Sequence, residues 1–283
     1  MPLIEVKPSL DLFAPALVAA FDGWVDAGSA ATAALAQVAE GADTVATFDA
    51  DSIFDYRARR PTLDIVDGRL SELSWPELAI RRVRAGGRDL LVMAGPEPDY
   101  RWRELADDVV RLAAELHVVE WISLGAIPAA VPHTRPVPIL GTASRPGLLK
   151  GNVQAGPAGT LRVPAAAISV LEMTVGATGI PAVGYFAQVP HYVTGPYPGA
   201  AVELLAALGR HIGVELAPGS LVGEARQLRT RLDAAAAVDE STRSYVERLE
   251  TMVDESRLPS GDELISEIER FLRDRGGESS GLN

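Results

Sequence analysis

The sequence contains no cysteine, and lysine occurs only at positions 7 and 150 of its 283 residues. Without cysteine, the chain can form neither disulfides nor thiolate-ligated zinc or iron–sulfur sites, and it has no cysteine nucleophile. The net charge is −12, and the nearest thing to a basic cluster, Arg57, Arg59 and Arg60, follows several aspartates. Because a protein that binds nucleic acid normally presents a basic stripe, we expect no nucleic-acid partner.

Long apolar runs are also lacking. No run reaches the roughly 18–20 residues that a membrane span needs, and the first residues do not combine a basic segment with an apolar core, as a signal peptide does. We therefore expect a cytoplasmic protein with no membrane partner. The composition, 47% hydrophobic and 23% charged, is that of an ordinary globular protein, and the length suits one large domain with a smaller appendage.

Short apolar runs alternate with helical patterns up to residue 217. The candidate strands are Leu3–Val6, Ala16–Phe21, Thr44–Phe48, Leu63–Val66, Ala79–Val83, Leu90–Met93, Trp121–Leu124, Val137–Leu140 and Ala182–Phe186. The candidate helices are Ala27–Ala39, Trp102–Leu116, Ala166–Thr178 and Gly199–Ile212. This alternation predicts an α/β domain over residues 1–217, with a mostly parallel sheet covered by helices on both faces. Residues 63–84 are typical of an antiparallel excursion, and residues 144–164 of a long loop.

The amino-acid composition changes after Pro218, where glycine becomes rare and charged residues become frequent. The apolar residues there recur at heptad-like spacing in three groups: Leu221, Ala225, Leu228, Leu232 and Ala235; Tyr245, Leu249 and Met252; and Leu264, Ile268 and Phe271. This spacing predicts a C-terminal extension of three helices over residues 218–275, followed by a disordered tail over 276–283. The helices must bury these stripes against each other, against the sheet domain or against another subunit.

The segment from Asp22 to Gly28 lies between a predicted strand and a predicted helix. Open α/β sheets place their ligand crevices at such carboxyl ends of strands. The turn carries two acids and a tryptophan, side chains that a turn does not need merely to connect a strand to a helix. Asp26 stands just before the helix and can cap it, whereas Asp22 has no helix amide that it must satisfy.

The loops after the other predicted strands are also polar and aromatic, and in a parallel sheet they would converge on one edge. We call these side chains the rim: Asp22, Trp24, Asp26, Asp55, Tyr56, Arg57, Arg60, Glu97, Asp99, His133, Arg135, His191 and Tyr192. One interpretation is a polar pocket or a recognition surface, since loop tryptophans often anchor interfaces. The other is a set of solvated loops held by internal salt bridges.

Known catalytic and cofactor motifs are missing. The glycines at 23 and 28 are not followed by a lysine, so a phosphate loop of the Walker type is excluded, and no Gly-x-Gly-x-x-Gly or Gly-x-Ser-x-Gly segment marks a dinucleotide site or a nucleophile elbow. The four histidines form no His-x-x-x-His pair. We assign no catalytic residue and expect no metal and no cofactor, which favours a protein that is not an enzyme.

The loop motifs together resemble the proteasome assembly chaperone 2-like family, in its actinobacterial and archaeal branch. The matching segments are 21–28 (FDGWVDAG), 55–61 (DYRARRP), 95–99 (GPEPD), 131–136 (VPHTRP) and 189–192 (VPHY). The resemblance spans about residues 3–215. It implies a fold similar to the phosphorylase/hydrolase-like nucleoside phosphorylases, oligomers that are often trimers, and chaperone-like roles around proteasome assembly.

The resemblance brings no catalytic residues with it. Members that dock on the proteasome often end in a hydrophobic-Tyr-any tail, and the printed sequence ends in Gly281-Leu282-Asn283, so docking through such a tail is not expected.

Two functional hypotheses follow. The first is a non-enzymatic, assembly-chaperone-like protein that acts as a homo-oligomer, a trimer by resemblance, with proteasome subunits as partners. The second is a protein or enzyme that binds a small, nucleoside-like molecule at the rim. The missing motifs favour the first hypothesis, and the density of ionisable side chains on the rim favours the second.

Overall fold

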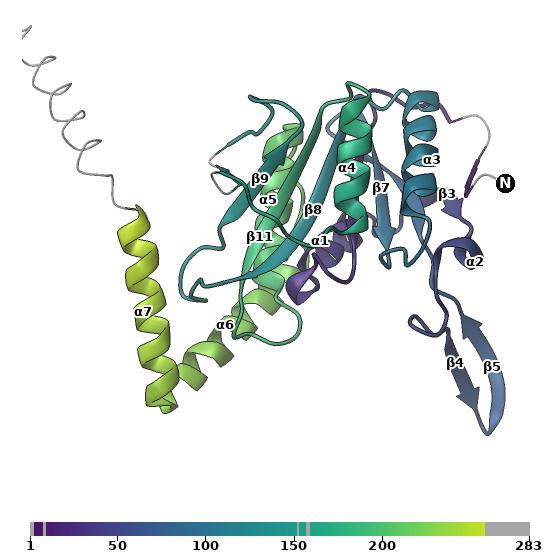
Figure 1. Cartoon of the computed structure of the whole chain (residues 1–283). Coiled ribbons are helices and arrows are strands. Elements are labelled where there is room, and N and C mark those ends of the chain that lie inside the picture. The colour runs from purple at the N-terminus through teal and green to yellow at the C-terminus, as the bar shows by residue number, and fades with distance from the viewer. Residues whose placement is uncertain (1–2, 8–9, 152, 157–158, 258–283) are drawn as a thin grey trace, which may run out of the picture.

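The computed structural model in Figure 1 describes residues 3–7, 10–151, 153–156 and 159–257. The strands are β1 (Ile4–Val6), β2 (Ala16–Phe21), β3 (Asp43–Phe48), β4 (Thr62–Val66), β5 (Arg69–Ser74), β6 (Ala79–Ala85), β7 (Arg88–Gly95), β8 (Glu120–Ala129), β9 (Ile139–Ala143), β10 (Gln154–Ala155) and β11 (Ala182–Pro190). The helices are η1 (Ala27–Ser29), α1 (Ala30–Val38), α2 (Ala50–Ile53), α3 (Trp102–Glu115), α4 (Ala167–Ala177), α5 (Pro198–Ile212), α6 (Leu221–Val238) and α7 (Glu240–Arg257).

The main sheet is mixed, with a parallel centre. Its strand order is β1-β3-β6-β7-β2-β8-β11-β9-β10. The four central strands β7, β2, β8 and β11 are parallel, while β1, β3 and β6 pair antiparallel on one side and β9 pairs antiparallel with β11 on the other. The sequence thus predicted the parallel centre. At β6 and β7 a short turn lets the chain run straight back, which makes that pair antiparallel.

Helices cover both faces of the sheet, as predicted. Leu17 and Ala19 of β2 pack with α3 and α4 on one face, and the alternate residues Ala16 and Val18 pack with α1 and α5 on the other. This alternation follows from the two-residue period of a strand, which turns successive side chains to opposite faces. Trp121 of β8 is completely buried and belongs to the core.

A buried polar network ties the sheet to α5 at the amino ends of the central strands. Glu120, the first residue of β8, accepts a 2.6 Å ion pair from Arg88 and lies 3.2 Å from Nε2 of His211, whose Nδ1 meets the Tyr185 hydroxyl at 2.7 Å. Burial alone would raise the pKa of Glu120, but the hydrogen bonds from His211 and Arg88 outweigh it and lower that pKa to about 2. The carboxylate is therefore a stabilising anion in the folded chain.

The predicted antiparallel excursion contains a separate two-stranded hairpin, β4–β5, followed by β6 in the main sheet. The hairpin projects away from the body on the side of α2 and β3 (Figure 1). Its root is held by Trp75, whose ring meets that of Tyr56 edge to face at 4.7 Å between centroids. Within the described part of the predicted loop 144–164, the two-residue strand β10 pairs with β9.

Two of the three predicted C-terminal helices, α6 and α7, lie within the described residues, and the third lies outside them. A single residue, Asp239, separates α6 from α7. On α7 the buried residues are Val246 and Leu249, while Met252 is 57% exposed, so the packed line is shifted from the predicted stripe. None of the helices in the described ranges combines the length and apolarity that crossing a membrane requires. The division of the chain at residue 217 stays a prediction.

Candidate functional site

Asp26 of the rim caps a helix. Its Oδ1 accepts a hydrogen bond from the backbone N–H of Ala31 at 2.7 Å, and its Oδ2 accepts one from the Thr32 hydroxyl. Ser29, which directly precedes α1, makes no side-chain cap bond, so Asp26 supplies the acceptor that the first turn needs. Burial of this carboxylate raises its pKa, although the bonds from Thr32 and Ala31 oppose the change. The capping interpretation of Asp26 is confirmed.

Asp22 joins two strand-end loops. Its Oδ1 accepts a 2.8 Å ion pair from Arg59 and a 2.9 Å hydrogen bond from the backbone N–H of Glu97. The loops after β2 and β7 lie next to each other because these strands are parallel neighbours. The side chain of Asp22 is 49% exposed, so the pair with Arg59 positions the loops more than it stabilises the fold.

Glu97 caps a second helix. Its Oε1 accepts a 2.7 Å hydrogen bond from the backbone N–H of Ala167, the first residue of α4. The residue before α4 is Ala166, which has no side-chain acceptor, so a carboxylate from a distant loop satisfies the helix terminus.

Asp55 and Asp99 complete the first group of contacts. Asp99 accepts a 2.8 Å hydrogen bond from the backbone N–H of Asp55 and lies 3.5 Å from Nε of Arg59. The Tyr100 hydroxyl donates to Asp55 at 2.9 Å. Hydrogen bonds from the Arg57 amide and from Tyr100 lower the pKa of Asp55. These contacts hold the loop after α2 against the loop after β7.

Four side chains of the same loops point to solvent. Trp24 is 64% exposed and Tyr100 49% exposed, and Arg57 and Arg60 are also exposed. We call Trp24, Arg57, Arg60 and Tyr100 the Trp24 surface. Tyr56 instead turns toward the hairpin root and donates its hydroxyl to Asp51.

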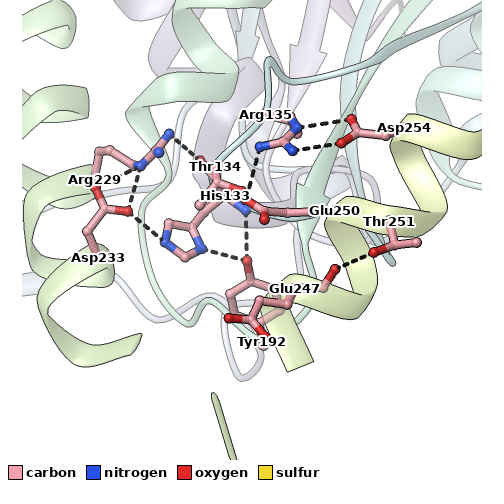
Figure 2. Close-up of polar contacts among 10 residues, drawn as sticks. All are labelled: His133, Thr134, Arg135, Tyr192, Arg229, Asp233, Glu247, Glu250, Thr251 and Asp254. Carbon is pink, nitrogen blue, oxygen red and sulfur yellow. Dashed lines mark hydrogen bonds and ion pairs between the residues drawn. The ribbon is translucent and has the colours of Figure 1, made fainter. Parts of the chain in front are cut away.

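The remaining rim residues meet the C-terminal helices (Figure 2). His133 is 4% exposed, and burial lowers its pKa in spite of the opposing charge of Asp233. The Tyr192 hydroxyl accepts the His133 backbone N–H at 2.7 Å and also lies 2.7 Å from Nδ1 of the ring. Nε2 of the same ring faces Oδ1 of Asp233 at 3.2 Å.

Arg135 connects the same loop to α7. Its guanidinium pairs with Glu250 at 3.0 Å and with Asp254 at 2.7 Å, and Figure 2 shows both carboxylates reaching toward it from α7. On α6, Arg229 donates to the backbone carbonyl of His133 at 2.9 Å and pairs with Asp233. We call the contacts of His133, Arg135, Arg229 and their acidic partners the latch.

His191 and Tyr192 follow β11 and reach the same helix. Nδ1 of His191 lies 2.9 Å from the carbonyl oxygen of Ala129, and its Nε2 lies 2.9 Å from the Tyr245 hydroxyl of α7. The rings of His191, Tyr192 and Tyr245 pack edge to face. The loops after β8 and β11 are thus used to seat the C-terminal helices.

The rim is therefore divided between two groups of contacts, one around Asp22 and one at the latch. Among the residues that the structure describes, no three His, Asp or Glu side chains gather as a metal ion requires. A groove of about 590 Å³ lies beside the latch between α5 and α6, and it is lined by residues such as Val202, Leu228 and Leu232. The acids, the histidines and Arg135 of the rim make contacts within the chain, as helix caps, ion pairs or hydrogen bonds, whereas Arg57 and Arg60 point to solvent.

Sequence reasoning missed several members of these groups. The ion pairs with Asp22 and Asp99 are made by Arg59 and not by Arg57 or Arg60. A turn has no periodicity that could distinguish Arg59 from the other two arginines. Asp233 had a signal, because it stands four residues after Arg229 on a helix, where opposite charges meet.

The comparison with family models and one of the similar solved structures name the same family. Residues 20–236 match the PAC2 family. The fold is similar to that of a protein of unknown function from Corynebacterium glutamicum, with a TM-score of 0.84, 29% identity, and coverage of 90% of this chain and 97% of that one. No curated protein matches the chain.

Two further solved structures are more similar in sequence. The proteasome-assembly chaperone homologue of Mycobacterium tuberculosis has 34% identity and a TM-score of 0.74, with coverage of 82% of this chain and 99% of that one. A PAC2 family protein of Streptomyces avermitilis has 35% identity and a TM-score of 0.73, with the same coverage.

Proposed function

Because the chain belongs to the PAC2 family, we propose that it is a non-enzymatic, assembly-chaperone-like protein that acts as a trimer and holds proteasome subunits. The family and the chaperone homologue of Mycobacterium tuberculosis support a chaperone-like role. That the partners are proteasome subunits and that three copies assemble are parts of this proposal.

One observation carries the non-enzymatic part: the acids and histidines of the rim are held by contacts within the chain. Acid–base catalysis needs groups that face a substrate with tuned protonation. Here Asp26 and Glu97 cap helices, Asp22 holds Arg59, and His133 is a buried neutral ring between Tyr192 and α6. These contacts favour a scaffold over an active site.

We propose that partners bind at the Trp24 surface, which joins three rim residues to Tyr100. Tryptophan, tyrosine and arginine are the residues that most often dominate binding energy in protein interfaces. Trp24 and Tyr100 present large apolar area, and Arg57 and Arg60 add charge beside them. The ion pairs of Arg59 with Asp22 and Asp99 hold these loops in one geometry. A surface held in this way loses less conformational entropy when a partner binds.

Affinity capture tests this proposal. The tagged chain is expressed in its source cells and recovered from the lysate, and co-purifying proteasome α-type subunits are quantified by mass spectrometry. The expected result is their recovery at a fixed ratio to the wild-type chain and their loss with Trp24→Ala. Leu161→Ala is the matched control, since Leu161 has the same 64% exposure outside the rim. Absence of α-type subunits from the wild-type capture contradicts the proposal.

A second candidate, binding of a nucleoside-like molecule, has one observation in its favour. Trp24 offers an exposed aromatic face two residues from the carboxylate of Asp22, a combination that suits a base and a sugar hydroxyl. Thermal stabilisation of the purified chain by nucleosides, lost in Asp22→Ala, would support this candidate. No stabilisation at millimolar nucleoside would reject it.

A further inference from the structure

A groove of about 500 Å³ lies beside α4, and the residues that line it are not part of the rim. Its lining includes Thr142 of β9, Ser169, Glu172 and Met173 of α4, and Phe186 of β11. The volume is that of a small-molecule pocket, and Glu172 is the one charged residue in the lining. We call this the α4 groove.

The ring of Phe186 lies against the sheet, where two glycines make room for it. Gly184 stands two residues before it on β11, and Gly125 of β8 is its partner in the register. A Cβ atom on either glycine would be 2.6 Å from a carbon of the ring, closer than Cβ atoms come. Neither glycine has a positive φ, so the backbone conformation does not require them. Glycine inside a strand often marks a close approach, and here it lets the ring form a wall of the groove.

The carboxylate of Glu172 reaches the same place from α4. Its Oε1 accepts a 2.7 Å hydrogen bond from the Thr142 hydroxyl. Its Oε2 lies 2.8 Å from the position that a Cβ on Gly184 would take, so the carboxylate and the Phe186 ring stand side by side over that glycine. Thr142 is neutral, and within the described part of the chain no basic side chain pairs with Glu172. The negative charge in the groove is therefore uncompensated.

A carboxylate next to an aromatic ring suits a positively charged organic ligand. The face of an aromatic ring attracts a cation, and the carboxylate supplies the opposite charge. Met173, which is 77% exposed, adds a polarisable apolar side chain to the lining. An anion would be repelled by Glu172, and a wholly apolar ligand would leave the half-buried carboxylate without a partner.

We infer that the α4 groove binds a small organic cation, a primary amine carried on an apolar or aromatic body. The ammonium group donates to Oε2 of Glu172, and the body lies against Phe186 and Met173. The α4 groove and the Trp24 surface share no residue, so this inference and the proposed function can fail independently of each other.

Titration of the purified full chain with phenethylamine, followed by calorimetry at neutral pH, tests the site. We expect saturable binding to the wild-type chain and a dissociation constant raised at least tenfold by Glu172→Gln, which keeps the shape of the side chain and removes its charge. Glu203→Gln is the matched control, because Glu203 is also a half-buried glutamate that lines a groove, the one between α5 and α6. It should leave the affinity unchanged.

Two further comparisons separate the ring and the charge of the ligand. Phe186→Leu should also weaken the amine, with circular dichroism confirming that the variant is folded. Phenethyl alcohol and phenylacetate keep the ring without the positive charge, so both should bind at least tenfold more weakly than the amine. The inference is wrong if millimolar phenethylamine does not bind the wild-type chain. It is also wrong if Glu172→Gln binds the amine as the wild-type chain does, or if the alcohol binds as tightly as the amine.

Discussion

The carboxylate of Glu97 caps a helix that begins 70 residues later in the chain, by accepting a 2.7 Å hydrogen bond from the backbone N–H of Ala167. This bond fixes α4 against the loop after β7, and that loop also carries Tyr100 of the Trp24 surface. Replacing Glu97 with alanine should lower the free energy of unfolding by about 1 kcal/mol, the usual cost of losing a helix cap.

Urea unfolding followed by circular dichroism measures this loss. Glu97→Gln is the control, since its amide oxygen can still accept the Ala167 amide, and it should lose less than half as much. Equal stability of the alanine variant and the wild-type chain would show that water replaces the cap without cost.

Asp26 should be the more costly cap. Asp26→Ala removes two acceptors at a buried site and leaves the Ala31 amide without its partner, so we expect a loss of about 2 kcal/mol. Ser29→Ala, three residues along the chain, removes no side-chain cap bond and should change the free energy of unfolding by less than about 0.5 kcal/mol. Similar losses for the two variants would contradict the assignment of Asp26 as the cap.

The free energy of unfolding should decrease at acidic pH because Glu120 becomes protonated. Its folded pKa of about 2 lies below its ordinary value of 4.5, so the stabilisation is fully present above pH 4.5 and is lost as the pH falls toward 2. The difference corresponds to about 3 kcal/mol. Unfolding free energies measured from pH 6 to pH 2 should decline less steeply in Glu120→Gln, which should be less stable than the wild-type chain at pH 7. Parallel curves for the two proteins would contradict the role of Glu120.

The latch should control how firmly α7 is held. Arg135→Ala removes the ion pairs with Glu250 and Asp254, so hydrogen exchange in residues 240–254 should become faster while exchange in α3 stays unchanged. Arg243→Ala is the control, because Arg243 pairs with Glu240 within α7 itself. The exposed part of the latch should also weaken as salt is raised. Equal exchange in the Arg135 and Arg243 variants would show that apolar packing alone seats α7.

The sequence predicted those parts of the fold that depend on local patterns. The uninterrupted apolar run Ala16–Phe21 indicated a strand buried on both faces. Asp26 could be recognised as a cap because its helix follows at once. Each of these inferences needs only residues within one or two turns of chain.

Contacts between distant segments were beyond that reach. Nothing near Glu97 indicates that it serves α4, and nothing in residues 57–60 indicates that Arg59 turns inward while Arg57 and Arg60 turn out. The latch was hidden for the same reason, because His133 and Arg135 meet partners about a hundred residues away. Whether the rim binds a ligand or a partner stays a prediction.

The most direct test of the account is a binding measurement between the purified chain and purified proteasome α-type subunits, by native mass spectrometry and titration. We expect a complex of fixed stoichiometry, with a dissociation constant raised at least tenfold by Trp24→Ala and unchanged by Leu161→Ala. No complex with the wild-type chain, or equal affinity for the chain with and without Trp24, would contradict the account.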